Sequence, residues 1–243
     1  MRLAVIADIH GNFGALCAVL EDISRRNVDT VLNLGDHVSG PLQARETADL
    51  LMSCGHLVIR GNHDRQVLDS NRETMRASDR AAADLLSEAH REWLASLPAT
   101  AWVSEDIFLC HGTPASDCEY FLEEVTEAGT HRAEPDLVLA RAGKVAASLI
   151  LCGHTHIPGA ERLADGRLIV NPGSAGLQAY RDEFPFPHKM ETGSPHARYA
   201  VLEKQKTWEV QFVQVSYDWE TTAKLAESHC REDWAKALRT GIA

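Results

Sequence analysis

The sequence of 243 residues lacks the features of a protein that binds polyanions or membranes. It holds 24 Lys and Arg against 35 Asp and Glu, a formal net charge of −11, and such a surface repels nucleic-acid backbones and anionic lipids. No apolar run approaches the roughly 20 residues that cross a bilayer, and the first run meets Asp8 too soon for a signal peptide. We expect no duplex nucleic acid or membrane as partner, and a cytoplasmic location.

The chain also lacks cysteine pairs and nucleophile motifs. Its six cysteines show no CxxC spacing, so reduced thiols are expected, with Cys110 and Cys152 buried in apolar runs. The pattern GxSxG is absent as well. This argues against a metal-dependent amidase with a serine or cysteine nucleophile, an alternative that nothing else in the sequence favours.

Short apolar runs that end in polar residues recur along the chain, and they are typical of strands buried on both faces. The five runs are LAVIADIHGN, TVLNLGDH, HLVIRGNHD, DIFLCHGTP and LILCGHTHIP. We expect helices over residues 13–26 and 43–53, a helical insert over about 65–97, a proline-rich loop over about 175–196 and a C-terminal helix over about 219–240. No composition shift marks a boundary, so residues 1–243 are predicted to form one α/β domain.

Each of the five runs delivers side chains of the kind that bind metals. In open α/β sheets the residues just past the carboxyl ends of strands form the functional crevice. Those residues are Asp8, His10, Asp36, Asn62, His63, His111, His154 and His156. In DIH and HTH, alternate residues of an extended backbone would project to one side and bind together. Six other histidines are interpreted as structural or surface residues: His37, His56, His90, His131, His196 and His229.

The donor types in this set indicate a particular chemistry. Imidazole, carboxylate and amide ligands favour Mn, Fe, Zn or Ni over Ca or Mg. Two divalent ions about 3.5–4 Å apart clamp the attacking and leaving oxygens of a phosphoryl displacement. We therefore expect two divalent metal ions as cofactors, with Mn first, and a small phosphate ester as substrate.

The ordered motifs DIH, GDH, RGNHD, CHG and GHTH resemble the five signature blocks of the calcineurin-like metallophosphoesterases, over residues 8 to about 174. The chain is most similar to the compact bacterial and archaeal branch of small phosphodiesterases. The resemblance implies a four-layer α-β-β-α sandwich of two mixed sheets flanked by helices. It implies one metal held by Asp8, His10, Asp36 and His156, and a second held by Asp36, Asn62, His111 and His154.

In this reading a hydroxide bridging the metals would attack in line, and His63 would face the substrate as general acid or charge stabiliser. Further candidates for substrate contact are Asn12, Arg60, Arg65, Thr113, His188 and Lys189. One departure matters: the protein-phosphatase branch has an aspartate and an arginine where Ser39 and Gly40 stand here. A protonated His63 would lack an acidic partner and no arginine would hold the phosphate. This favours a singly charged phosphodiester or a small nucleotide with a good leaving group.

Two other functions stay open at this point. The first is a nucleotide or dinucleoside polyphosphate hydrolase, or a phosphomonoesterase, because the residues that set specificity would lie in 65–97 and 175–196. The second is a non-catalytic protein-binding scaffold on the same fold. Loss of ligands would favour the scaffold, and all eight positions carry side chains suited to the site.

Overall fold

Strand β1 (Arg2–Ile6) shows how the sheets are buried, because its side chains alternate between two cores. Leu3 and Val5 pack into the core between the two sheets. Ala4 and Ile6 pack on the other side against helix α1 (Phe13–Ser24). Residues 3–6 of this strand are all apolar because both faces of the strand are covered.

The computed structural model describes residues 1–69 and 71–243, and it places two five-stranded mixed sheets face to face. The order in the first sheet is β14 (Trp208–Val215), β13 (Ala197–Lys204), β1, β2 (Thr30–Asn33) and β3 (Leu57–Val58). The order in the second is β4 (Thr100–Ser104), β5 (Ile107–Cys110), β8 (Leu149–Leu151), β10 (Leu168–Asn171) and β9 (Gly159–Arg162). β1, β2 and β3 run parallel, as do β5, β8 and β10.

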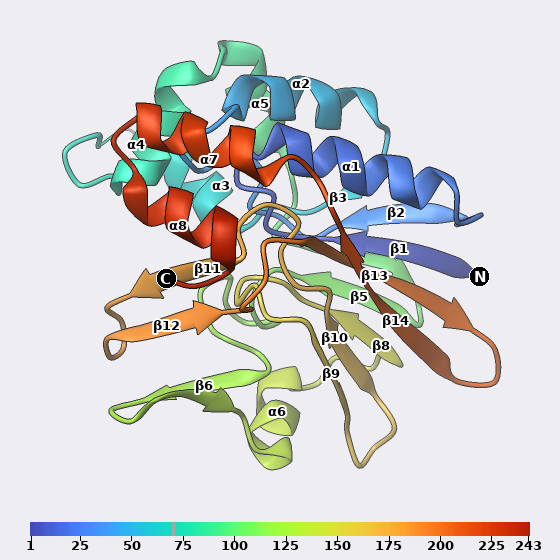
Figure 1. Cartoon of the computed structure of the whole chain (residues 1–243). Coiled ribbons are helices and arrows are strands. Elements are labelled where there is room, and N and C mark those ends of the chain that lie inside the picture. The colour runs from blue at the N-terminus through green and yellow to red at the C-terminus, as the bar shows by residue number, and fades with distance from the viewer. Residues whose placement is uncertain (70) are drawn as a thin grey trace.

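Helices cover the outer face of each sheet (Figure 1). The first sheet carries α1 and α2 (Ala44–Ser53), and the second carries α6 (Pro135–Ala142), which packs on Phe108 and Ile150. The predicted α-β-β-α sandwich is thus confirmed. Cys110 and Cys152 are fully buried with free thiols, as expected. Within residues 1–69 and 71–243, no helix has the length and hydropathy needed to span a membrane.

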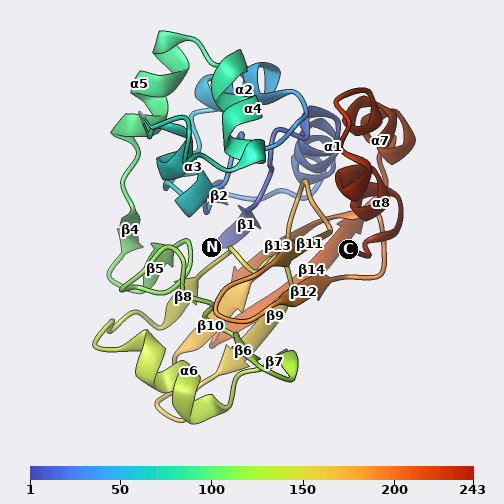
Figure 2. The same ribbon diagram turned by 90° about the vertical axis from the view of Figure 1, so that its left-hand side faces the viewer.

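The insert is helical as predicted, while two other segments differ from their predicted form. The insert contains α3 (Asn62–Val67), α4 (Ala77–Leu85) and α5 (Glu88–Ser96), with irregular turns between α3 and α4. The C-terminal region forms two helices, α7 (Trp219–Ser228) and α8 (Glu232–Thr240), because Cys230 adopts a left-handed conformation with φ 56° and ends the first. Both lie near α1 (Figure 2).

The proline-rich segment is a β-hairpin rather than a loop. Strands β11 (Ala179–Asp182) and β12 (His188–Glu191) pair antiparallel, and His188 and Met190 are buried while Lys189 and Glu191 are exposed. This alternation of buried and exposed side chains is hard to recognise in the sequence, because one of the two buried side chains is a histidine. A second small hairpin pairs β6 (Glu123–Thr126) with β7 (Gly129–Arg132).

Candidate metal centre

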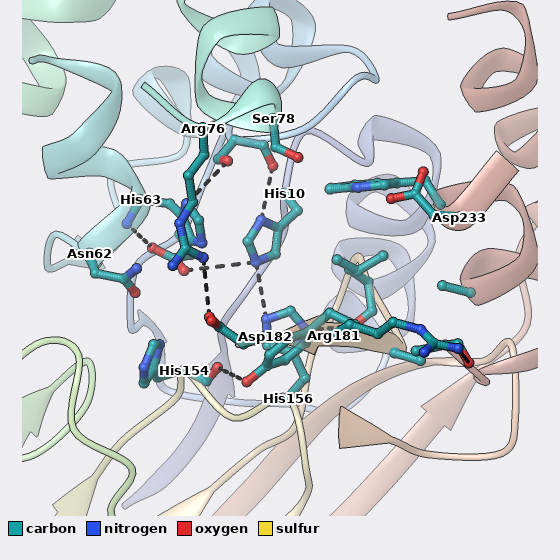
Figure 3. A pocket seen from close by; sticks show the side chains of 18 of the residues that line it. His10, Asn62, His63, Arg76, Ser78, His154, His156, Arg181, Asp182 and Asp233 are labelled. Atoms are coloured by element: carbon teal, nitrogen blue, oxygen red, sulfur yellow. Dashed lines mark hydrogen bonds and ion pairs between the residues drawn. The ribbon is translucent and has the colours of Figure 1, made fainter. Parts of the chain in front are cut away.

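The side chains that follow the five predicted strands converge at one edge of the two sheets. Figure 3 shows His10, Asn62, His154 and His156 among them. Two groups of three present ligand atoms within 4.8 Å of one another: Asp8, His10 and His156, and Asp36, His111 and His154. The groups adjoin, because Asp36 Oδ2 lies 3.2 Å from His111 Nε2 and 3.8 Å from His10 Nε2. Asn62 Oδ1 lies 3.0 Å from His111 Nε2. The arrangement suits two cations with Asp36 between them.

Each histidine of the centre uses one ring nitrogen to bond a backbone carbonyl. His10, His111 and His156 place Nδ1 at 2.9, 2.7 and 2.7 Å from the carbonyl oxygens of Ser39, Leu34 and Leu177. His154 uses Nε2 instead, 3.1 Å from the carbonyl oxygen of Cys118. A carbonyl fixes an N–H on the nitrogen it faces, so the other nitrogen of each ring keeps its lone pair for a metal.

The backbone at the centre is not extended, so the reason given above for the DIH and HTH spacing is wrong. Five candidate ligands adopt left-handed φ values between 51° and 70°: Asp8, His10, Asp36, His154 and His156. They follow the strands in tight turns; β1, for example, ends at Ile6. Left-handed conformations are disfavoured for residues with a Cβ, and they gather at functional sites where surrounding structure enforces them.

A buried network beneath the centre enforces the turn at Asp36. The Asp64 carboxylate accepts hydrogen bonds from the backbone amides of Asp36, His37 and Gly61 at 2.8, 2.9 and 2.9 Å. It also lies 2.7 Å from His37 Nδ1, which agrees with a structural role for that histidine. A Cβ on Gly61 would lie 2.1 Å from Asp36 Oδ1, so only glycine allows this close approach.

The electrostatics of the centre suit metal binding. Burial lowers the pKa of His10 to about 4 and that of His154 to about 3, so both rings are neutral, the form that binds metals. Burial raises the pKa of Asp8, which a nearby cation would reverse. Burial opposes protonation of His111, but Asp36 raises its pKa, and a cation would take the place of that proton. Asp36 Oδ2 is buried without a hydrogen bond among the described residues. The residues therefore fit divalent metal ions.

His63 lies beside this centre and has an acidic partner that was not predicted from the sequence. Its amide donates to Asp36 Oδ1 at 2.9 Å, while its Nδ1 lies 2.7 Å from Oδ1 of Asp79, a buried residue in the first turn of α4. The expectation that His63 lacks an acidic partner is therefore wrong. Burial opposes protonation of His63, but Asp36 and Asp79 together raise its pKa. Asp79 comes from the helical insert, 16 positions from His63, and not from the segment after Asp36.

A cavity of about 590 Å³ opens from the centre. Its metal end is lined by His10, Asp36, Asn62, His63, His154 and His156. Its other side is lined by α4, the β11–β12 hairpin and α8, with Arg76, Asp182, Phe184, Arg231 and Trp234. Arg76 extends past His63 and its guanidinium donates to Asp182 at 3.1 Å (Figure 3). An arginine thus lies near the centre after all.

The six predicted substrate contacts do not line this cavity. Asn12 caps α1 and donates to the Gly176 carbonyl at 2.8 Å, and Arg65 forms a bidentate pair with Asp117 at 2.8 and 2.9 Å. Thr113 is buried and donates to Glu119 at 2.8 Å. These side chains serve the fold, so the sequence prediction is corrected for them.

The other three candidates lie outside the cavity lining for different reasons. His188 is buried behind the cavity, where its Nε2 lies 2.8 Å from the Tyr120 hydroxyl. Lys189 points out from β12, with Nζ 3.9 Å from Glu191. Arg60 is not among the lining residues, and its amide donates to the Pro98 carbonyl at 2.8 Å. The proline-rich segment nonetheless borders the cavity, through Phe184 and Asp182.

Comparison with known proteins agrees with this geometry. The family model of the calcineurin-like phosphoesterase superfamily domain matches residues 1–188, and the chain belongs to that family. An uncharacterized protein of Methanocaldococcus jannaschii is 27% identical over 244 residues, which cover 89% of this chain and 88% of that protein. The family is one of metal-dependent phosphoesterases, and the two groups described above are the candidate ligands here.

Solved structures with the same fold include two of full length. A metallophosphoesterase from Sphaerobacter thermophilus is 26% identical, covers 100% of both chains and superimposes with a TM-score of 0.78. A hypothetical protein from Pyrococcus horikoshii OT3 is 22% identical, with 99% of this chain and 98% of that chain covered and a TM-score of 0.77. The second likeness shows the fold alone.

Proposed function

We propose that the chain is a two-metal phosphodiesterase acting on small molecules. The observation that carries the proposal is the convergence of two adjoining ligand groups at one end of a cavity of about 590 Å³. When bound, two divalent cations, with Mn²⁺ the first to test and Fe, Zn or Ni as alternatives, would neutralise the ester and supply an acidified water. Asp36 would contact both cations, and Asn62 would complete the second set.

The chain's own residues have separate parts in this proposal. His63 borders both the cavity and Asp36, so its Nε2 would give a proton to the leaving-group oxygen. Arg76 would bind a non-bridging phosphate oxygen after exchanging its contact with Asp182. The cavity walls would orient the two organic groups of a diester.

The preference for a diester rests on the lining of the cavity. Arg76 and Arg231 already pair with the lining carboxylates of Asp182 and Asp233, at 3.1 Å and at 2.7–2.9 Å. They offer little free positive charge for a second phosphate, which disfavours a polyphosphate or dianionic ester. Trp234 and Phe184 add apolar surface suited to an organic group.

Metal analysis combined with a paired assay tests the proposal. The chain is stripped with chelator, loaded with Mn²⁺, Fe²⁺, Zn²⁺ or Ni²⁺, and given bis-p-nitrophenyl phosphate or p-nitrophenyl phosphate. We expect two metal ions per chain and a kcat/KM about tenfold higher for the diester, a difference of about 1.4 kcal/mol in transition-state binding. A preference for the monoester would favour the phosphomonoesterase or nucleotide alternative. Stable binding of no metal would favour the non-catalytic scaffold.

A further inference from the structure

A buried carboxylate lies behind His63 and is held by two donors. Asp79 is 1% exposed, and its Oδ1 lies 2.7 Å from His63 Nδ1 and 2.7 Å from the Ser39 hydroxyl. The other oxygen, Oδ2, is buried and has no hydrogen-bond partner among the described residues. A carboxylate buried at this depth is costly unless its partners hold it in place. Ser39 stands at the position where the protein-phosphatase branch has an aspartate.

The segment that carries Asp79 is fixed independently of His63. The Gly40 amide donates to the Ser78 carbonyl at 3.2 Å, and Arg231 of the α8 region donates to the Ser78 hydroxyl at 3.0 Å. Ala82 and Ala83 of α4 are buried in the core beneath. The helix start therefore does not rely on the His63 contact, so Asp79 can impose a geometry on His63 rather than follow it.

The contact defines which nitrogen of His63 meets a substrate. Because Asp79 accepts from Nδ1, that nitrogen carries the proton, and the ring turns its Nε2 away from Asp79. His63 lines the cavity with 20% of its side chain exposed. Within the described part of the chain Nε2 makes no hydrogen bond. The free nitrogen is therefore the one available to a leaving group.

We propose that Asp79 is a positioning residue for His63, supported by Ser39, and that the pair serves phosphodiesters with poorly stabilised leaving groups, such as the alkoxide of an alcohol or sugar. This inference rests on the function proposed above. In the step it serves, His63 starts doubly protonated, with one proton on each ring nitrogen. The oxygen of water bonds to phosphorus, the phosphorus–oxygen bond to the leaving group breaks, and the Nε2 proton passes to the leaving-group oxygen. The proton that the water loses goes to solvent, and solvent returns one to Nε2. A phosphate leaving group is already a stable anion and has little need of that proton.

A series of methyl aryl phosphates, from p-nitrophenyl to phenyl, tests the inference kinetically. Asp79→Ala should lower kcat for the phenyl ester by on the order of 100-fold and for the p-nitrophenyl ester far less, with KM changed less than about threefold. Ser39→Ala should act in the same direction but by only about threefold, because one donor to Asp79 is lost. The matched control is Asp84→Ala, an exposed aspartate of the same helix, which should change neither ester. Equal losses across the series would overturn the inference.

A second measurement does not depend on turnover. In the Zn²⁺-loaded chain labelled with ¹⁵N-histidine, the His63 Nδ1 proton should give a slowly exchanging NMR signal that is lost in Asp79→Ala and retained in Asp84→Ala. The metal content should stay at the wild-type value in both. An unchanged His63 signal in Asp79→Ala would overturn the positioning role. Loss of the His63 signal in Asp79→Asn with unchanged kinetics would overturn it as well. If the wild-type chain hydrolysed no ester, the proposed function would fail while this signal would still decide the role of Asp79.

Discussion

The two sides of the cavity are built in different ways. The metal side includes Asp8, His10, Asp36, His111 and His156, none more than 3% exposed, on turns that follow strands of both sheets. The opposite side presents long, accessible groups on helices and a hairpin: the Arg76 side chain is 54% exposed and Phe184 is 75% exposed. Rigid, buried groups suit a reaction that is the same for every ester, and accessible groups suit the part of a substrate that varies.

The two sides also differ in their relation to the family. The metal side lies within residues 1–188, which the family model matches. The opposite side lies only partly within them, since Arg231 and Trp234 lie beyond residue 188. Mutations on the metal side should therefore abolish metal binding or the chemical step. Mutations on the opposite side should alter which ester is accepted.

The largest effect is expected for Asp36→Asn. This carboxylate lies between the two ligand groups, so its replacement should weaken both metals, by about 10–100-fold each if the effect resembles other changes around metal sites. Because the proposed reaction needs both ions, turnover of bis-p-nitrophenyl phosphate at limiting metal should fall by the product of the two losses, about 10²–10⁴-fold or more. Metal analysis by mass spectrometry measures the content, and Asp165→Asn, on an exposed turn, is the control. Loss of only one metal would argue against a shared ligand.

His63→Ala should affect the reaction and spare the metals. Without a proton donor at the leaving group, kcat should drop on the order of 10²–10⁴-fold, with both metals retained. His131→Ala provides a matched histidine control, because its side chain is half exposed on β7 and pairs with Glu124, outside the cavity lining. Unchanged turnover in His63→Ala would remove His63 from the mechanism.

Arg76→Ala tests the opposite side. Its exposed ion pair with Asp182 contributes little stability, but a lost charged hydrogen bond to phosphate should lower kcat/KM by about tenfold. Arg65→Ala is the matched control, since Arg65 also pairs with an aspartate, Asp117, but outside the cavity. If both variants lost activity equally, Arg76 would have no special role in binding phosphate.

The smallest effect is expected for Phe184→Ala, at the mouth of the cavity. The ring is 75% exposed, so the free energy of unfolding should change by less than about 0.5 kcal/mol. KM should rise about threefold for a bis-aryl diester and stay unchanged for a dialkyl one, because only the aryl group gains from ring contact. Steady-state kinetics on the two substrates measures the difference. Equal changes in both KM values would show that the loop does not select among organic groups.

The metal side could be predicted because each of its residues follows an apolar run that alone specifies a buried strand. Even there the local reason was wrong, since Asp8 and His10 converge through left-handed turns that no two-residue spacing reveals. Asp79 and Arg76 could not be predicted. They approach His63 only because α4 packs across the segment after Asp36, and no periodic pattern in the insert encodes that tertiary contact. His188 was wrongly predicted to contact a substrate from a loop. Its alternation with Met190 instead marks the buried face of a strand.

The left-handed turns at five ligand positions have a consequence for the protein without metals. Each such residue is less stable than in an ordinary conformation by about 1–2 kcal/mol, and only the surrounding structure and a bound cation can offset that penalty. The turns after β1 and β8 should exchange their amide hydrogens faster in the apo protein than in the metal-loaded protein, while exchange in the strands beneath them stays the same. This edge of the two sheets would then reach its full stability only when the ions bind.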